Sequence, residues 1–244
     1  MTDYDRRYGE RWASIYDGLF ATLPELDETV GFLHRKAGGK PALELGVGTG
    51  RVAIPLAEAG VEVHGIDVSP EMVDRMKAKP GGDRIPVSFG NFADVDVKGS
   101  FGVVYVVFNT LFSLTSQEEQ TRCFRNVAAH LEPGGSFVIE AFVPDVGRFD
   151  SRGGHFSPLQ IATDEVAFEV SRYNRASQQV TTQVIVLREE TTRLYPISIR
   201  FAYPSELDLM AQLAGLTLVE RWADWSCTPF TATSANHVSV YVRS

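Results

Sequence analysis

The sequence predicts an α/β protein built around a mostly parallel sheet. Between residues 41 and 142, short apolar segments alternate with segments of helical periodicity, as in repeated strand–helix–strand units. Residues 101–108 are almost entirely apolar and rich in valine, which is expected of a central strand buried on both faces. Right-handed crossovers between such strands place helices on both faces of one open sheet.

Caps and periodicity place the individual elements of this core. Two helical patterns, at residues 10–20 and 26–34, precede the first strand. Ser69 caps a helix that begins at Pro70, where the missing N–H costs nothing, and Ser116 with Glu119 forms a capping box. Strands are expected at residues 41–45, 61–66, 85–89, 101–108 and 136–142, with helices at 51–59, after Ser69, and at 116–130.

The last third of the chain has a different pattern. Residues 165–173, 180–188 and 194–203 alternate polar and apolar side chains, which predicts an inserted antiparallel sheet. A helix at 204–213 and strands at 216–225 and 237–242 should then complete the main sheet. Residues 147–157, which include Gly153 and Gly154, are expected to form a mobile loop.

The most informative stretch runs over residues 42–51 and reads Ala-Leu-Glu-Leu-Gly-Val-Gly-Thr-Gly-Arg. Three alternating glycines after a strand allow a sharp turn and let a ligand lie against the main chain, because no Cβ stands in the way. Asp67 follows Gly50 by seventeen positions, at the end of the next strand, where a carboxylate can accept hydrogen bonds from both hydroxyls of a ribose. Together these features predict a nucleoside site.

The glycine spacing separates two kinds of nucleoside cofactor. A dinucleotide fingerprint requires G-x-G-x-x-G, and its third glycine is replaced here by Arg51. The pattern E-L-G-x-G-x-G instead resembles motif I of the class I S-adenosylmethionine-dependent methyltransferases. Leu131, Pro133 and the following glycine pair also resemble that family, and the resemblance spans residues 16–142. It is closest to the small-molecule methyltransferases of bacterial secondary metabolism.

The resemblance implies a Rossmann-like, seven-stranded, mostly parallel sheet with helices on both faces, an N-terminal helical lid and an inserted antiparallel sheet. We expect one methyltransferase domain over residues 1–244: N-terminal helices (1–38), a cofactor-binding core (40–145), inserted strands (160–203) and a closing helix and strands (204–244). The N-terminal helices could equally cover one edge of the sheet. The inserted sheet shapes the substrate site or a dimer interface in the family, so a homodimer stays open.

S-adenosylmethionine is the implied cofactor, and its methyl group would be displaced in line by an oxygen, nitrogen or carbon nucleophile. Asn91 and Phe92 follow the third strand, where an amide and an aromatic ring suit an adenine. The complete expected cofactor set is Tyr16, Glu44, Gly46, Gly48, Gly50, Arg51, Asp67, Val68, Met72, Asn91, Phe92, Phe108 and Asn109.

The candidate catalytic residues are Tyr16, Asn109, His155 and His237. His155 lies in the expected mobile loop and His237 begins the last strand, whereas the other three histidines fall inside or at the ends of regular elements. The rivals for this role are Glu140, Tyr195 and Arg200. Amino-sugar N-methyltransferases of the family carry a histidine near the position of Ser113, so this departure weakens an amino-sugar assignment. Aromatic residues near the predicted strand ends favour a partly apolar, small-molecule acceptor.

Composition argues against several other functions. The net charge is −8, from 23 basic and 31 acidic residues, so no global basic field would attract nucleic acid or an anionic membrane. No apolar run approaches the length of a membrane span, and no secretory signal is evident, which favours a cytoplasmic protein. Cys123 and Cys227 form no metal-ligand pair, and no metal is expected.

Two alternatives to methyl transfer remain: a cyclase or similar enzyme that keeps the cofactor as a scaffold, and a non-enzymatic cofactor-binding protein.

Overall fold

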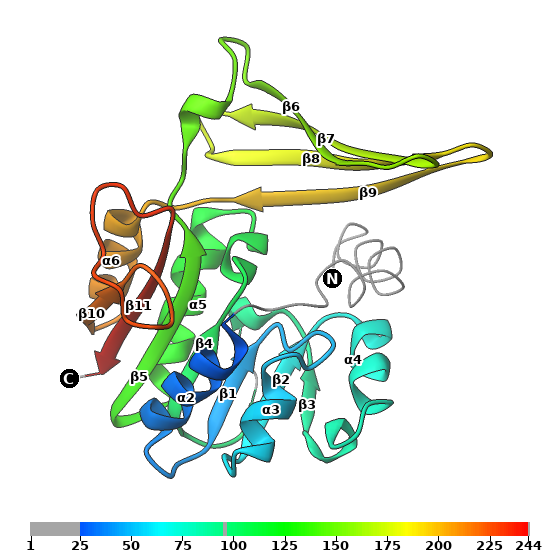
Figure 1. The fold of residues 1–244 in the computed structure, drawn as a ribbon. Helices are drawn as coiled ribbons and strands as arrows, with labels where there is room; N and C mark the ends of the chain where they lie inside the picture. The colour runs from blue at the N-terminus through cyan, green and yellow to red at the C-terminus, as the bar shows by residue number, and fades with distance from the viewer. Residues whose placement is uncertain (1–24, 95–96, 244) are drawn as a thin grey trace.

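The computed structural model describes residues 25–94 and 97–243 (Figure 1). The helix expected at residues 10–20, and with it Tyr16, lies outside the described residues. The main sheet has seven strands in the order β10-β11-β5-β4-β1-β2-β3, and only β11 runs antiparallel to its neighbours. These strands are β1 (Ala42–Leu45), β2 (Val63–Asp67), β3 (Val87–Phe89), β4 (Phe101–Val106), β5 (Leu131–Phe142), β10 (Leu216–Trp222) and β11 (Asn236–Arg243). The predicted sheet is confirmed.

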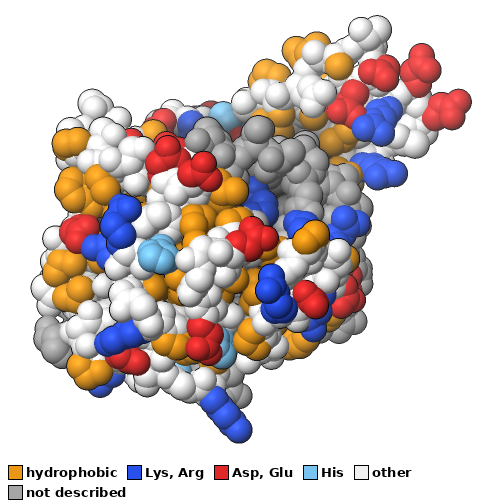
Figure 2. Space-filling model, turned by 60° about the horizontal axis from the view of Figure 1, so that its bottom comes forward, with side chains coloured by type: hydrophobic (Ala, Val, Ile, Leu, Met, Phe, Trp, Pro, Cys, Tyr) orange, Lys and Arg blue, Asp and Glu red, His pale blue; other side chains and the backbone are white. Residues whose placement is uncertain are grey.

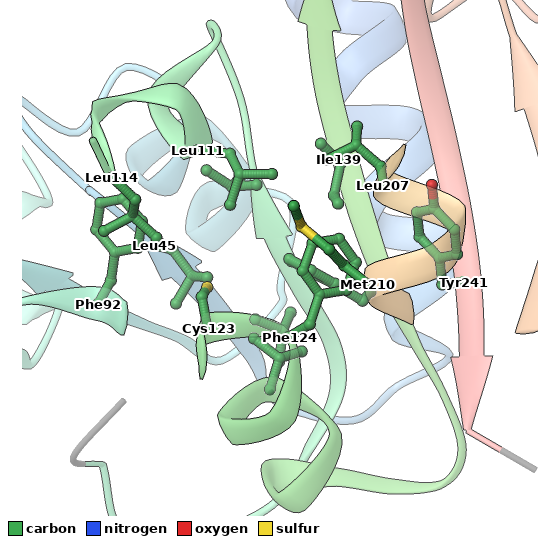
Figure 3. Packing of buried hydrophobic residues seen from close by; sticks show 14 of the residues in the cluster. Leu45, Phe92, Leu111, Leu114, Cys123, Phe124, Ile139, Leu207, Met210 and Tyr241 are labelled. Atoms are coloured by element: carbon green, nitrogen blue, oxygen red, sulfur yellow. The ribbon is translucent and has the colours of Figure 1, made fainter. Parts of the chain in front are cut away.

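Helices cover both faces of this sheet (Figure 1). One face carries α2 (Leu26–Ala37), α3 (Ala53–Glu58) and α4 (Pro70–Lys77), and the other carries α5 (Gln117–His130) and α6 (Pro204–Leu213). Each layer encloses its own buried apolar cluster. In the α5–α6 layer, Phe124 and Met210 pack near Ile139 of β5 (Figure 3). Burial of each such side chain stabilises the folded state by about 1.5–3 kcal/mol, and the packed sheet supports the loops at its edges.

The expected helix caps are present. Ser69 Oγ accepts a hydrogen bond from Met72 N at 3.2 Å, and Pro70 is the first residue of α4. Ser116 Oγ accepts from Glu119 N at 3.1 Å at the start of α5. Both helices therefore begin where local hydrogen bonding predicts.

The helix α2 belongs to the main α/β layer. Phe32 and Leu33 are buried in the same cluster as α3 and α4, and the helix packs against β4 and β5. This helix therefore covers a face of the sheet, and it is neither a lid nor an edge cover.

The inserted sheet has four antiparallel strands: β6 (Gly154–Ile161), β7 (Glu165–Asn174), β8 (Gln179–Arg188) and β9 (Thr191–Arg200). It stands beyond the carboxyl ends of the parallel strands and projects past α4 (Figure 1). The expected mobile loop at 147–157 was wrong for residues 154–157, because β6 begins at Gly154 and pairs with β7. The insertion therefore begins at Gly154 and not at residue 160. Alternation was hard to recognise in β6 because Ser157 and Pro158 interrupt it.

Two further findings concern the described residues alone. None of their helices is both long and apolar enough to cross a membrane. They also contain no group of three or more His, Cys, Asp or Glu side chains that could hold a metal ion.

Candidate functional site

The glycine loop after β1 forms one wall of the site, and its three glycines differ in what surrounds them. All three have positive φ, at +75° for Gly46, +54° for Gly48 and +76° for Gly50. A Cβ on Gly46 would lie 2.5 Å from Thr110 Cγ2, and one on Gly50 would lie 2.5 Å from Met76 Cγ. A Cβ on Gly48 would meet nothing closer than Gly46 O at 3.9 Å. Two glycines thus permit close packing, while Gly48 faces open space where a ligand can approach the main chain.

Asp67, the last residue of β2, lies directly against this loop. Its Oδ2 accepts a hydrogen bond from Gly48 N at 2.7 Å, and its Oδ1 accepts one from Ser69 N at 2.8 Å. Burial raises the pKa of this carboxyl, while backbone donors at Ser69, Gly48 and Val68 oppose the rise. The carboxylate is therefore held in place beside Gly48, with its orientation set before any ligand binds.

Glu44 and Arg51 border a small cavity next to the glycine loop. The cavity measures about 30 Å³, and its lining consists of Glu44, Gly46, Val47, Gly48, Thr49, Arg51, Val107, Phe108 and Thr110. Glu44 is buried and accepts a hydrogen bond from Tyr105 OH at 3.0 Å. Burial raises its pKa to about 8, and the charge of Asp67 adds to the rise while the Tyr105 hydroxyl and Arg51 oppose it.

A strained turn after β4 forms the opposite wall. Phe108 and Asn109 are consecutive non-glycine residues with φ of 55° and 63°, a conformation that costs about 1–2 kcal/mol per residue. Glu140 Oε2 accepts a hydrogen bond from Phe108 N at 3.0 Å, and Asn109 Oδ1 accepts one from Phe142 N at 2.6 Å. The Arg51 guanidinium lies 4.2 Å from the centre of the Phe108 ring. Side chains from β5 and the glycine loop thus hold the turn beside the cavity.

Asn109 and Glu140 therefore have structural contacts that the sequence did not predict. The amide oxygen of Asn109 accepts a hydrogen bond from the backbone of β5, which is a structural role. A catalytic role for Asn109 stays a prediction. Burial raises the pKa of Glu140, while the Phe108 N–H and the Trp225 side chain oppose the rise.

The residues expected around the adenine lie at the β2–β3 side of the same edge. Asn91 Oδ1 accepts from Ala93 N at 2.9 Å, and Phe92 is buried below Gly46 in the α5 layer. Met72 of α4 packs against Val184 and Tyr195 of the inserted sheet. The insertion therefore covers α4 next to the glycine loop, which places it close enough to shape a binding site.

The two candidate histidines lie apart from the cavity. His237 is completely buried in β11, its Nδ1 is 2.9 Å from Ser239 Oγ, and burial lowers its pKa to about 4. His155 lies on β6, where its Nε2 is 3.2 Å from Glu169 Oε1 and its Nδ1 is 3.0 Å from Arg148 O. Neither ring lines the cavity formed by the described residues. Sequence position could not show this, because the register of β11 and the existence of β6 decide it.

Two residues that lie at or next to the cavity were not singled out from the sequence. Thr110 touches the glycine loop, and Tyr105 contacts the carboxyl of Glu44. A lone hydroxyl inside the apolar run 101–108 was an available signal, because a buried tyrosine hydroxyl needs a hydrogen-bond partner.

The groups that border this cavity fit S-adenosylmethionine. Gly48 leaves the main chain open where a Cβ would intrude, and the Asp67 carboxylate beside it offers oxygens and negative charge to a cationic ligand. The Glu44 carboxyl borders the same cavity. These groups lie at the carboxyl ends of β1, β2 and β4, where the strand order reverses and α/β sheets bind ligands.

Known proteins agree with this interpretation. A family model described as a methyltransferase domain matches residues 42–135. The chain is 30% identical over 240 residues to the cypemycin N-terminal methyltransferase of Streptomyces sp, which covers 97% of both chains. The structure of the CcbJ methyltransferase from Streptomyces caelestis matches with a TM-score of 0.91 and 42% identity, over 98% of this chain and 99% of that one. CalS10, an amino pentose methyltransferase from Micromonospora echinaspora, shares the fold at 19% identity and a TM-score of 0.68. The chain belongs to the class I S-adenosylmethionine-dependent methyltransferases.

Proposed function

We propose that this methyltransferase acts on an amine of a small, partly apolar molecule. The full-length similarity to an enzyme named for methylating the N-terminus of cypemycin carries the proposal, because that acceptor is an amine. A shorter match, 27% identical over 140 residues, is to an N,N-dimethyltransferase of an amino-sugar nucleotide from Saccharopolyspora spinosa. An amine needs only to be bound in its neutral form, so no strong base is required.

The geometry of the described residues supports the cofactor-binding part of this proposal. S-adenosylmethionine, when bound, supplies a methyl group that its sulfonium already activates towards in-line displacement. Asp67 would accept hydrogen bonds from the ribose, Gly48 would admit the ligand to the main chain, and the Phe108–Asn109 turn would border the acceptor side. The protein contributes mainly proximity and alignment, which are worth up to about 7–11 kcal/mol. Tyr16 is a further candidate for orienting the acceptor, although it lies outside the described residues.

The surroundings of the turn support an apolar acceptor. Phe112 and Phe142 pack edge to face at 5.1 Å beside Asn109, and Phe149, Tyr173 and Phe201 form a row of rings with centroid distances of 5.0 and 5.3 Å. Ser113 donates its hydroxyl hydrogen to Thr110 O at 2.8 Å. It therefore does not replace the acid–base group that amino-sugar enzymes carry near this position, which favours an amine outside that class.

Labelled cofactor provides the deciding experiment. The protein would be incubated with methyl-labelled S-adenosylmethionine and a panel of primary and secondary amines, including peptides with free N-termini, and with matched alcohols. We expect labelled product and S-adenosylhomocysteine in equal amounts with at least one amine. Asp67→Ala should lose this activity together with cofactor affinity.

The same assay tests the two alternatives. Turnover of an acceptor without formation of S-adenosylhomocysteine would favour a cyclase-like enzyme. Tight cofactor binding with no turnover across the panel would favour a non-enzymatic binding protein.

We infer that the inserted sheet pairs with a second copy of the chain. Its outer face exposes apolar side chains, among them Phe156 at 63%, Ile161 at 79% and Leu194 at 45%. Exposed apolar surfaces of this kind mark interaction sites, and a two-fold pair would bury the same face on both subunits. Acidic and basic side chains are mixed on the face seen in Figure 2, with no extended area of one sign there. Light scattering should therefore find a dimer that Ile161→Lys converts to a monomer, and a monomeric wild type would refute this assembly.

A further inference from the structure

Tyr105 and Glu44 form a buried pair at the base of the candidate cofactor site. They lie directly opposite each other in the parallel pairing of β1 with β4, and the Tyr105 hydroxyl donates to Glu44 Oε2 at 3.0 Å. Tyr105 is fully buried, whereas the Glu44 carboxyl borders the cavity beside the glycine loop. The pair therefore joins the interior of the sheet to the site.

The titratable groups around Glu44 come from three other parts of the chain. Tyr105 faces it from β4, Asp67 from β2, and Arg51 from the loop before α3, while the backbone N–H of Ala53 reaches it from the start of that helix. Burial raises the pKa of Asp67 too, but three backbone donors, at Gly48, Ser69 and Val68, oppose that rise and stabilise its negative charge. Glu44 has fewer donors, is more deeply buried and is repelled by Asp67. Of the two carboxyls, Glu44 is the one that retains a proton before a cationic ligand binds, even with Arg51 nearby.

We propose that Tyr105 is a positioning residue for the cofactor site, and that Glu44 releases one proton to solvent when the positively charged methyl donor binds beside it. The O–H bond of the Glu44 carboxyl breaks, water or buffer takes the proton, and the resulting carboxylate keeps the Tyr105 hydroxyl as its donor. Tyr105 itself stays protonated, because burial holds its pKa well above the ordinary value of 10.0. The inference rests on the proposed placement of the cofactor at this loop.

The proton count can be measured by calorimetry on the full chain. S-adenosylmethionine would be titrated at pH 7 in two buffers that differ in ionisation enthalpy. With a pKa of about 8, about nine in ten Glu44 carboxyls carry a proton at this pH, so close to one proton should be released per cofactor bound. Affinity should rise about tenfold per pH unit between pH 6 and 8 and then level off. Identical enthalpies in both buffers would overturn the proposal.

Two variants locate the proton and the residue that positions it. Glu44→Gln should abolish both the proton release and the pH dependence. Tyr105→Phe should weaken binding about 10- to 100-fold at pH 7 and move the levelling-off to higher pH, because a donor to the carboxylate is lost. Tyr241→Phe is the matched control: this buried hydroxyl donates to Asp208 at 2.9 Å, away from the cavity, so binding should not change. Equal behaviour of the two tyrosine variants would exclude a positioning role for Tyr105.

A readout without cofactor and a separate pair of variants complete the test. The infrared difference spectrum between wild type and Glu44→Gln should show a protonated carboxyl at pH 7, and only a carboxylate signal would contradict the proposal. If Gly48→Val and Asp67→Ala bind S-adenosylmethionine as tightly as wild type, the placement of the site is wrong. If they weaken binding while wild type releases no proton, the site stands and only the present inference fails.

Discussion

Alanine at each of the three loop glycines should have three different effects, although the sequence treats these glycines alike. Every alanine would adopt a positive φ, which costs about 1–2 kcal/mol. Gly46→Ala also places a methyl group 2.5 Å from Thr110 Cγ2, and a threonine is stiff about χ1, so overpacking adds about 1–3 kcal/mol. Gly50→Ala places its methyl group 2.5 Å from Met76 Cγ and 3.0 Å from Ile54 Cδ1, so it is overpacked as well, but an unbranched methionine side chain adapts more readily than a threonine. The methyl group of Gly48→Ala would lie no closer than 3.9 Å to another atom, Gly46 O. This variant should therefore be destabilised only by the strain of its backbone conformation.

Urea unfolding of the cofactor-free protein should therefore rank Gly46→Ala as the most destabilised, by about 2–5 kcal/mol. Gly48→Ala should instead lose the most cofactor affinity relative to its loss of stability, because its methyl group enters the space left for the ligand. Calorimetry with S-adenosylmethionine measures the affinity, and the urea experiment measures the stability. Thr110→Ser removes Cγ2 and should recover part of the stability lost in Gly46→Ala, with Thr110→Ser alone as the control. Equal losses of stability and affinity in all three variants would refute the distinction between packing glycines and a ligand-facing glycine.

Three further predictions concern charged side chains. Burial raises the pKa of Glu44 from 4.5 to about 8, so the contribution of Glu44 to stability should fall as pH rises above 4.5, by about 3 kcal/mol at pH 7. Burial also raises the pKa of Asp67 and Glu140, so urea unfolding of Glu44→Gln at pH 5 and pH 7 should show a smaller loss than wild type, and an equal loss would contradict this. Asp67→Ala should weaken S-adenosylmethionine binding by about 1–3 kcal/mol in calorimetry, and unchanged affinity in a folded variant would remove Asp67 from the site. Arg200→Met should destabilise the protein by about 1–3 kcal/mol, because Gln120 Oε1 and Glu206 each lose a guanidinium donor at 2.7 Å while Gln117 and Gln178 still donate to Glu206. A thermal melt equal to wild type would contradict this.

Local patterns were sufficient to predict most of the core. The caps at Ser69 and Ser116, the apolar run of β4 and the glycine loop all depend on neighbours within a few residues, so their structure could be inferred before the fold was known. The inserted strand β6 was not predicted, because it depends on contacts with another strand and not on its own local pattern. Its pairing with β7 stabilises a segment whose own alternation is weak, and the expected mobile loop therefore contains a strand.

The sequence by itself determined the fold class, the family and the cofactor, because these follow from short segments whose order and spacing the chain specifies directly. Only the tertiary structure decided which side chains meet. It buried His237 completely, placed His155 on a strand, joined the Asn109 side chain to the backbone of β5, and set Tyr105 opposite Glu44. These outcomes depend on the register between strands that are distant in sequence, where a shift of one residue turns a side chain to the opposite face of the sheet.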